Sequence, residues 1–190
     1  MKPALLVVDM LKDTFEKHPD AFISKEALKF VPTINRLAAH FRRQGFPVVF
    51  ACDAFLPDDF IFQGKMKPHS IKGTRGAEVI DQLERRSEDL ILEKPRFSAF
   101  FKTELDQVLQ ADGVDTVAVT GIATHVCVLT TVLDAVASDF CAILLQDCCA
   151  AHKAEIHRSI IETYTRNMLS PLLRVMNAAD LMKEAMHGCD

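Results

Sequence analysis

The chain has 190 residues, of which 49% are hydrophobic and 25% are charged, and its mean hydropathy is +0.11. This length suits one domain, and the apolar fraction excludes a disordered chain. The chain has 22 Lys and Arg against 26 Asp and Glu, a net charge of −4, so it lacks the basic excess typical of nucleic-acid binding. We expect a single domain over residues 1–190 and no nucleic-acid partner.

The cysteines and one long uncharged stretch indicate where in the cell the protein is expected to be. The six cysteines form no CxxC pair and no Cys/His ligand spacing. The apolar run between Pro3 and Asp9 is too short for a signal peptide. Residues 116–133 carry no Asp, Glu, Lys or Arg, but Gly121, His125 and several threonines interrupt them, which favours a buried strand, turn and helix over a membrane span. We expect a cytoplasmic protein with reduced thiols and no membrane partner.

Apolar β-type runs alternate with helical patterns along the chain. Strands are expected at 4–8, 47–52, 89–92, 116–120, 141–146 and 172–176. Helices are expected at 24–44, 79–86, 103–111, 124–137, 154–165 and from 178. Strands that are apolar throughout and alternate with helices predict a parallel sheet covered on both faces, in a three-layer α/β/α domain. The gap at 53–76 has no regular pattern and is expected to be an ordered loop near a site.

Four reactive side chains fall at the carboxyl ends of predicted strands. Asp9, Asp53 and Lys94 follow the first three strands, and Cys127 lies just beyond the fourth. Each alone has an ordinary explanation, since carboxylates cap turns and cysteines fill cores. Ligands of open parallel sheets bind at this edge, so the four together predict an active site there.

Cys127 has the most specific setting. Thr124 is a candidate N-cap, which places the thiol in the first helical turn, where unpaired N–H groups favour a thiolate and could hold an oxyanion. Lys94 nearby would lower the pKa of the thiol further. Asp9 could accept the thiol proton and later protonate a leaving group. These are the parts that an acyl-transfer enzyme needs.

Four segments resemble those of the isochorismatase-like cysteine hydrolase superfamily, which includes nicotinamidases, N-carbamoylsarcosine amidohydrolases and ureidoacrylate hydrolases. They are V-V-D-M at 7–10, H-S-I-K-G-T-R-G-A-E at 69–78, K-P-R-F-S-A-F at 94–100 and G-I-A-T-H-V-C-V at 121–128. The resemblance implies a six-stranded, Rossmann-like parallel sheet and a catalytic triad of Asp9, Lys94 and Cys127. It also implies a cis peptide between Ile122 and Ala123, which would aim the Ala123 and Cys127 amides at the oxyanion, and a homo-oligomer, either a dimer or a tetramer.

The chain differs from nicotinamidases at one position where those enzymes have a metal ligand. Those enzymes are similar at Asp53 and His69 but carry a histidine two residues after the aspartate, where this chain has Phe55. Asp53 and His69 alone make a poor zinc site, although waters or a loop acid such as Asp58 or Asp59 could partly compensate. The alternative is that Asp53 caps a turn and His69 orders the loop. We predict no metal and no other cofactor.

The pocket is predicted from the same segments. Its expected wall residues are Phe15, Asp53, Phe55, His69, Phe97 and His125. Core packing explains Phe97 equally well, and His125 could instead cover the start of its helix.

Three functions compete. The first is a hydrolase that cleaves a C–N bond of a small carboxamide, carbamoyl or ureido substrate through a thioester, and Cys127 favours it. The second is an isochorismatase-type vinyl-ether hydrolase, in which Asp9 acts as the acid and no thiol is needed. The third is a non-catalytic small-molecule binding domain, against which the intact Asp, Lys and Cys set argues. Neither GxGxxG nor GxxxxGK[ST] occurs, so a nucleotide-binding loop is excluded.

Overall fold

The computed structural model describes residues 1–184. The strands are β1 (Pro3–Val8), β2 (Val48–Asp53), β3 (Leu90–Lys94), β4 (Thr116–Ile122), β5 (Cys141–Ala150) and β6 (Leu173–Met176). The helices are α1 (Lys12–Lys17), α2 (Phe22–Arg43), α3 (Leu105–Ala111), α4 (Leu129–Ala137), α5 (Ala154–Thr165) and α6 (Ala178–Glu184). None of the helices within residues 1–184 combines the length and apolarity that a membrane crossing requires.

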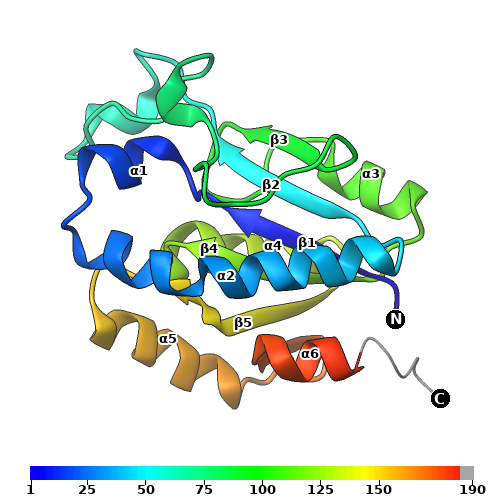
Figure 1. Cartoon of the computed structure of the whole chain (residues 1–190). Helices are drawn as coiled ribbons and strands as arrows, with labels where there is room; N and C mark the ends of the chain where they lie inside the picture. The colour runs from blue at the N-terminus through cyan, green and yellow to red at the C-terminus, as the bar shows by residue number, and fades with distance from the viewer. Residues whose placement is uncertain (185–190) are drawn as a thin grey trace.

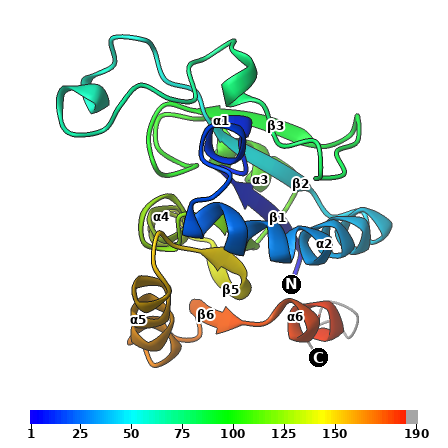
Figure 2. The ribbon, with the colours of Figure 1, turned by 60° about the vertical axis from the view of Figure 1, so that its left-hand side comes forward.

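The six strands form one parallel sheet in the order β3-β2-β1-β4-β5-β6, of which Figure 1 shows β1 to β5 and Figure 2 shows β6. Successive side chains of a strand point to opposite faces, so β1 sends Leu5 and Val7 into one core and Leu6 and Val8 into the other. Helices α2 and α6 cover the first face, and α3, α4 and α5 cover the second (Figure 2). The predicted three-layer α/β/α fold with a six-stranded parallel sheet is confirmed.

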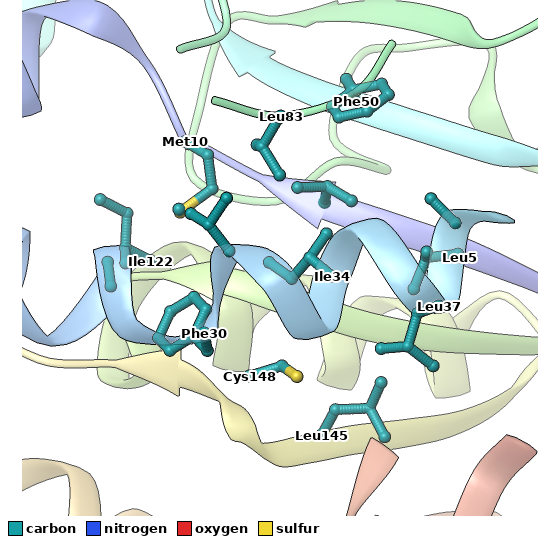
Figure 3. Close-up of a cluster of buried hydrophobic side chains, with 14 of the residues drawn as sticks. Leu5, Met10, Phe30, Ile34, Leu37, Phe50, Leu83, Ile122, Leu145 and Cys148 are labelled. Carbon is teal, nitrogen blue, oxygen red and sulfur yellow. The ribbon is translucent and has the colours of Figure 1, made fainter. Parts of the chain in front are cut away.

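The long helix α2 provides most of the cover on its face. Figure 3 shows Phe30, Ile34 and Leu37 of this helix lying over the strands, and all three are buried. They recur at helical spacing, which is the pattern that predicted the helix. Cys148 on β5 packs into the same core, as expected for an inert thiol.

The helix predicted at 79–86 is wrong. Val79 forms an isolated antiparallel bridge with Leu11, and the Ile80 N–H donates to the Met10 carbonyl at 3.0 Å. The apolar residues of this segment, including Leu83, do enter the core. This segment is extended at first and then turns, and it is not helical. Its backbone bonds to the residues after β1 in place of the bonds that it would make within a helix. Helix α1 was not predicted.

Gly121 brings β4 against the end of β1. It has a φ of +110°, and a Cβ at this position would lie 2.0 Å from the Val8 carbonyl oxygen. Gly121→Ala is therefore expected to lower the free energy of unfolding by at least about 3 kcal/mol. Urea unfolding measures this change, with Gly64→Ala as the control, because a Cβ at Gly64 meets nothing within 4 Å. Equal stability of the two variants would contradict the prediction.

Candidate active site

The site lies where the central strands end. Lys94 is the last residue of β3 and has no exposed surface. Its Nζ donates to Asp9 Oδ2 at 2.9 Å, to Asp53 Oδ1, and to the Arg96 carbonyl at 3.2 Å. Asp53 ends the neighbouring β2 and stands opposite Lys94 in the strand register. The parallel sheet thus places one buried ammonium between two carboxylates.

Asp9 is held in place from both sides. It directly follows β1 with a φ of +52°, a backbone conformation that aspartate tolerates better than most residues. Besides the bond from Lys94, its Oδ1 accepts the Asp53 N–H at 2.9 Å. With both oxygens engaged, the carboxylate has little freedom to turn away from the site.

Cys127 reaches the carboxylates from the turn that follows β4. The expected helix at 124–137 begins with a π-helical turn, Thr124–Val128, and continues as α4. Thr124 is the first residue of this turn and makes no capping bond, so the predicted N-cap is wrong. The thiol is buried, and the polar atoms of Cys127, Asp9 and Asp53 all lie within 4.8 Å of one another.

The expected low pKa of the thiol is also wrong. Burial raises the pKa of Cys127 well above its ordinary value, and the charge of Asp9 raises it further. Lys94 acts in the opposite direction but does not prevail. The resting thiol is therefore protonated, and it hydrogen-bonds to the Asp9 carboxylate.

Burial and mutual charge also shift the pKa values of the Lys94–Asp53 pair. Burial acts to lower the pKa of Lys94, but Asp9 and then Asp53 outweigh it, so that the pKa rises and the ammonium stays charged. Burial, followed by the charge of Asp9, raises the pKa of Asp53 to about 7, against the influence of Lys94.

A cavity of about 150 Å³ opens onto these groups. Its walls include the reactive residues Asp9, Asp53 and Cys127 together with Thr14, Ile23, Met66, His69, Phe97, Ile122, Ala123, Val126 and His152. The peptide between Ile122 and Ala123 is cis, as the resemblance implies. Of the six predicted wall residues, Asp53, His69 and Phe97 line the cavity.

The other three predicted wall residues lie elsewhere, which corrects the sequence-based expectation. Phe15 is buried in the core under α2. Phe55 has no exposed surface, and its ring packs against Phe62 and His69 at centroid distances of 5.4 Å. His125 is not among the residues that line the cavity, and its ring lies 5.5 Å from that of the wall residue His152.

Five of the wall residues were not predicted from the sequence, namely Thr14, Ile23, Met66, Val126 and His152. Met66 belongs to the segment after β2, drawn in cyan in Figure 2, which extends away from the body of the protein. His152 follows β5, whose end was predicted at 146 but lies at Ala150. With the correct strand end, the rule that selected Asp9 would have selected His152 as well.

Comparison with known proteins decides the family. The family described as Isochorismatase domain matches residues 3–177, which is most of the chain. The chain belongs to the isochorismatase family.

Two relatives and one solved structure illustrate the membership. A probable inactive nicotinamidase of Arabidopsis thaliana is 34% identical over 168 residues, which cover 83% of this chain and 85% of that protein. Ureidoacrylate amidohydrolase RutB of Acinetobacter baylyi is 41% identical over 98 residues, which cover 51% of this chain and only 39% of that enzyme. N-carbamoylsarcosine amidase of Thermoplasma acidophilum superposes with a TM-score of 0.79 at 34% identity, over 94% of this chain and 97% of that one.

Ligand atoms of Asp9, Asp53 and Cys127 converge within 4.8 Å of one another, but the neighbouring Lys94 ammonium makes this set a poor fit for a metal ion. Asp53 and Asp9 both accept from the Lys94 ammonium, whose charge would repel a cation between them. The Nδ1 of His69 is engaged by the Lys67 carbonyl at 2.9 Å, and the apolar Phe55 packs on its ring. A zinc site needs several free, converging donors.

Activity is therefore expected to survive metal removal. Dialysis against EDTA should leave turnover unchanged, and elemental analysis should find far less than one zinc per chain. The Phe55→His variant is the converse test. It supplies the imidazole that nicotinamidases have at this position and should raise the amount of zinc that the protein retains. One tightly held zinc per wild-type chain, with activity lost on its removal, would contradict the prediction.

Proposed function

We propose that the protein is a cysteine-dependent hydrolase that cleaves the C–N bond of a small carboxamide, carbamoyl or ureido compound through a thioester. The observation that carries this proposal is the contact between the Cys127 thiol and the Asp9 carboxylate at the wall of the cavity. A protonated, buried thiol becomes a nucleophile only when a base takes its proton, and Asp9 is the base in contact with it.

The first step forms the acyl enzyme. Cys127 Sγ attacks the carbonyl carbon of the substrate while the thiol proton passes to Asp9. The carbonyl oxygen becomes an oxyanion, for which the N–H groups of Ala123 and Cys127 are the proposed donors. As the intermediate collapses, the C–N bond breaks and Asp9 returns the proton to the leaving nitrogen, so that ammonia or an amine departs.

The second step releases the acid. A water molecule attacks the thioester carbon and gives a proton to Asp9, and the C–S bond then breaks. The departing sulfur takes that proton back, which restores the thiol and the carboxylate. Throughout both steps Lys94 remains charged beside Asp9 and stabilises its ionised form.

The family membership supports hydrolysis of non-peptide C–N bonds. RutB is named for ureidoacrylate and the Thermoplasma enzyme for N-carbamoylsarcosine, so carbamoyl and ureido compounds are the first substrates to test. The cavity of about 150 Å³ suits a small molecule, and Thr14, His69 and His152 offer polar contacts at its wall. A homo-oligomer and a cytoplasmic location stay predictions, which light scattering and cell fractionation would test.

Ammonia release from a substrate panel tests the proposal. The panel holds an aliphatic carboxamide, an aromatic carboxamide, an N-carbamoyl amino acid and a ureido acid, each at matched concentrations. We expect kcat/KM to be highest for the carbamoyl or ureido member by at least about tenfold, which corresponds to about 1.4 kcal/mol of transition-state binding. Folded protein that releases no ammonia from any member above the rate in buffer would overturn the proposal.

A further inference from the structure

A side-chain hydrogen bond ties the turn that carries Cys127 to helix α5. Thr124 Oγ1 lies 2.9 Å from His157 Nδ1. Thr124 has no exposed surface, and His157 is half-buried. Helix α5 begins on the side of the sheet where β4 and β5 end, so the bond bridges two elements at the edge that holds the site (Figure 1). The predicted chemistry of the site makes no use of either residue.

The position of Thr124 gives this bond its importance. Thr124 directly follows Ala123, whose amide is a proposed oxyanion donor, and it is the first residue of the turn Thr124–Val128 that contains Cys127. The turn also bonds back to its own start, because the Val126 and Val128 N–H groups both donate to the Ala123 carbonyl. Any shift of Thr124 therefore carries the nucleophile and the proposed oxyanion site with it.

The chemistry of the bond fits a fixed, neutral imidazole. Burial lowers the pKa of His157 and outweighs a backbone hydrogen bond to Gln146 of β5, which acts to raise it. A neutral ring with its proton on Nε2 leaves the Nδ1 lone pair to accept the Thr124 hydroxyl. The imidazole then links the turn to both β5 and α5.

We infer that His157 is a positioning residue, which holds Thr124 so that Cys127 and the Ala123 amide keep their places at the cavity. The inference rests on the proposed function for its turnover readout. Catalysis of this kind depends on placement, since a misplacement of about 1 Å can lower a rate by about a hundredfold. A merely structural His157 would instead support the packing of α5, whose Ile161 already lies in the core.

The test removes one partner of the hydrogen bond at a time, and Thr124→Val does so with little change in the shape of the side chain. Thr124→Val and His157→Leu are each expected to lower kcat by about tenfold to a hundredfold while KM changes by less than about threefold. The double variant should be no slower than the slower single variant, because both remove the same bond. Thr124→Ser keeps the hydroxyl and should retain nearly the wild-type kcat. Thr163→Val, an exposed position on α5, serves as the matched control with unchanged kcat.

A second readout does not depend on any substrate. The rate at which iodoacetamide labels Cys127, followed by peptide mass spectrometry, should change in Thr124→Val and His157→Leu and stay unchanged in Thr124→Ser and Thr163→Val. If the panel finds no amide substrate, this labelling still tests the positioning role, so the two failures are distinguishable. Losses of kcat that multiply in the double variant, or variants that only melt earlier with kcat and labelling intact, would overturn the inference.

Discussion

Replacement of Cys127 by Ala is expected to lower ammonia release by about 10⁴-fold or more, because the variant has no atom that can form the thioester. Cys127→Ser should be nearly as inactive. A serine hydroxyl holds its proton far more tightly than a thiol, and Asp9 with its Lys94 partner is too weak a base to remove it. Steady-state assays on the best substrate of the panel measure both losses.

Cys148→Ala is the matched control for this experiment. Cys148 is a fully buried thiol in the core under α2, so its truncation is expected to lower stability without changing kcat. If Cys127→Ala keeps its activity on the true substrate, the thioester mechanism is lost. The vinyl-ether mechanism, in which Asp9 protonates the substrate directly, would then take its place.

The reactive groups could be predicted from the sequence because strand ends are strong signals in a parallel sheet. Asp9 and Asp53 each close an apolar run and Lys94 ends β3, and all parallel strands present their carboxyl ends at one edge. His152 escaped the same rule for a local reason. The pairing of β4 with β5 shifts between Val119 and Gly121, and β5 continues beyond the polar residues that were read as its end.

The local sequence did not predict which side chains around the site are buried. Cys127 was expected to be a thiolate because its neighbours along the chain suggested a helix N-terminus beside a lysine. The folded chain buries the thiol against Asp9 instead, and loss of water raises its pKa. Phe55 shows the same limit, because an aromatic residue in a polar loop was assigned to the pocket wall, whereas contacts with Phe62 and His69 place it inside the loop.

Asp9→Asn is expected to change turnover and thiol reactivity in opposite directions. The amide cannot accept the thiol proton, so kcat should fall by about 10³-fold to 10⁴-fold. The same change removes the negative charge that raises the pKa of Cys127 and leaves Lys94, which lowers it. The thiol should therefore ionise at lower pH in the variant, and iodoacetamide should label Cys127 faster at pH 7 than in the wild type.

The two readouts separate a missing base from a damaged fold. The side-chain amide oxygen introduced by Asp9→Asn can still accept the Asp53 N–H, so the variant is expected to fold, which circular dichroism checks. Asp112→Asn, an exposed carboxylate at the end of α3, is the matched control and should leave kcat and the labelling rate unchanged. If Asp9→Asn slows labelling along with turnover, Asp9 would be holding the thiol in place rather than taking its proton. Faster labelling with lost turnover is the result that only a carboxylate base in contact with a protonated thiol produces.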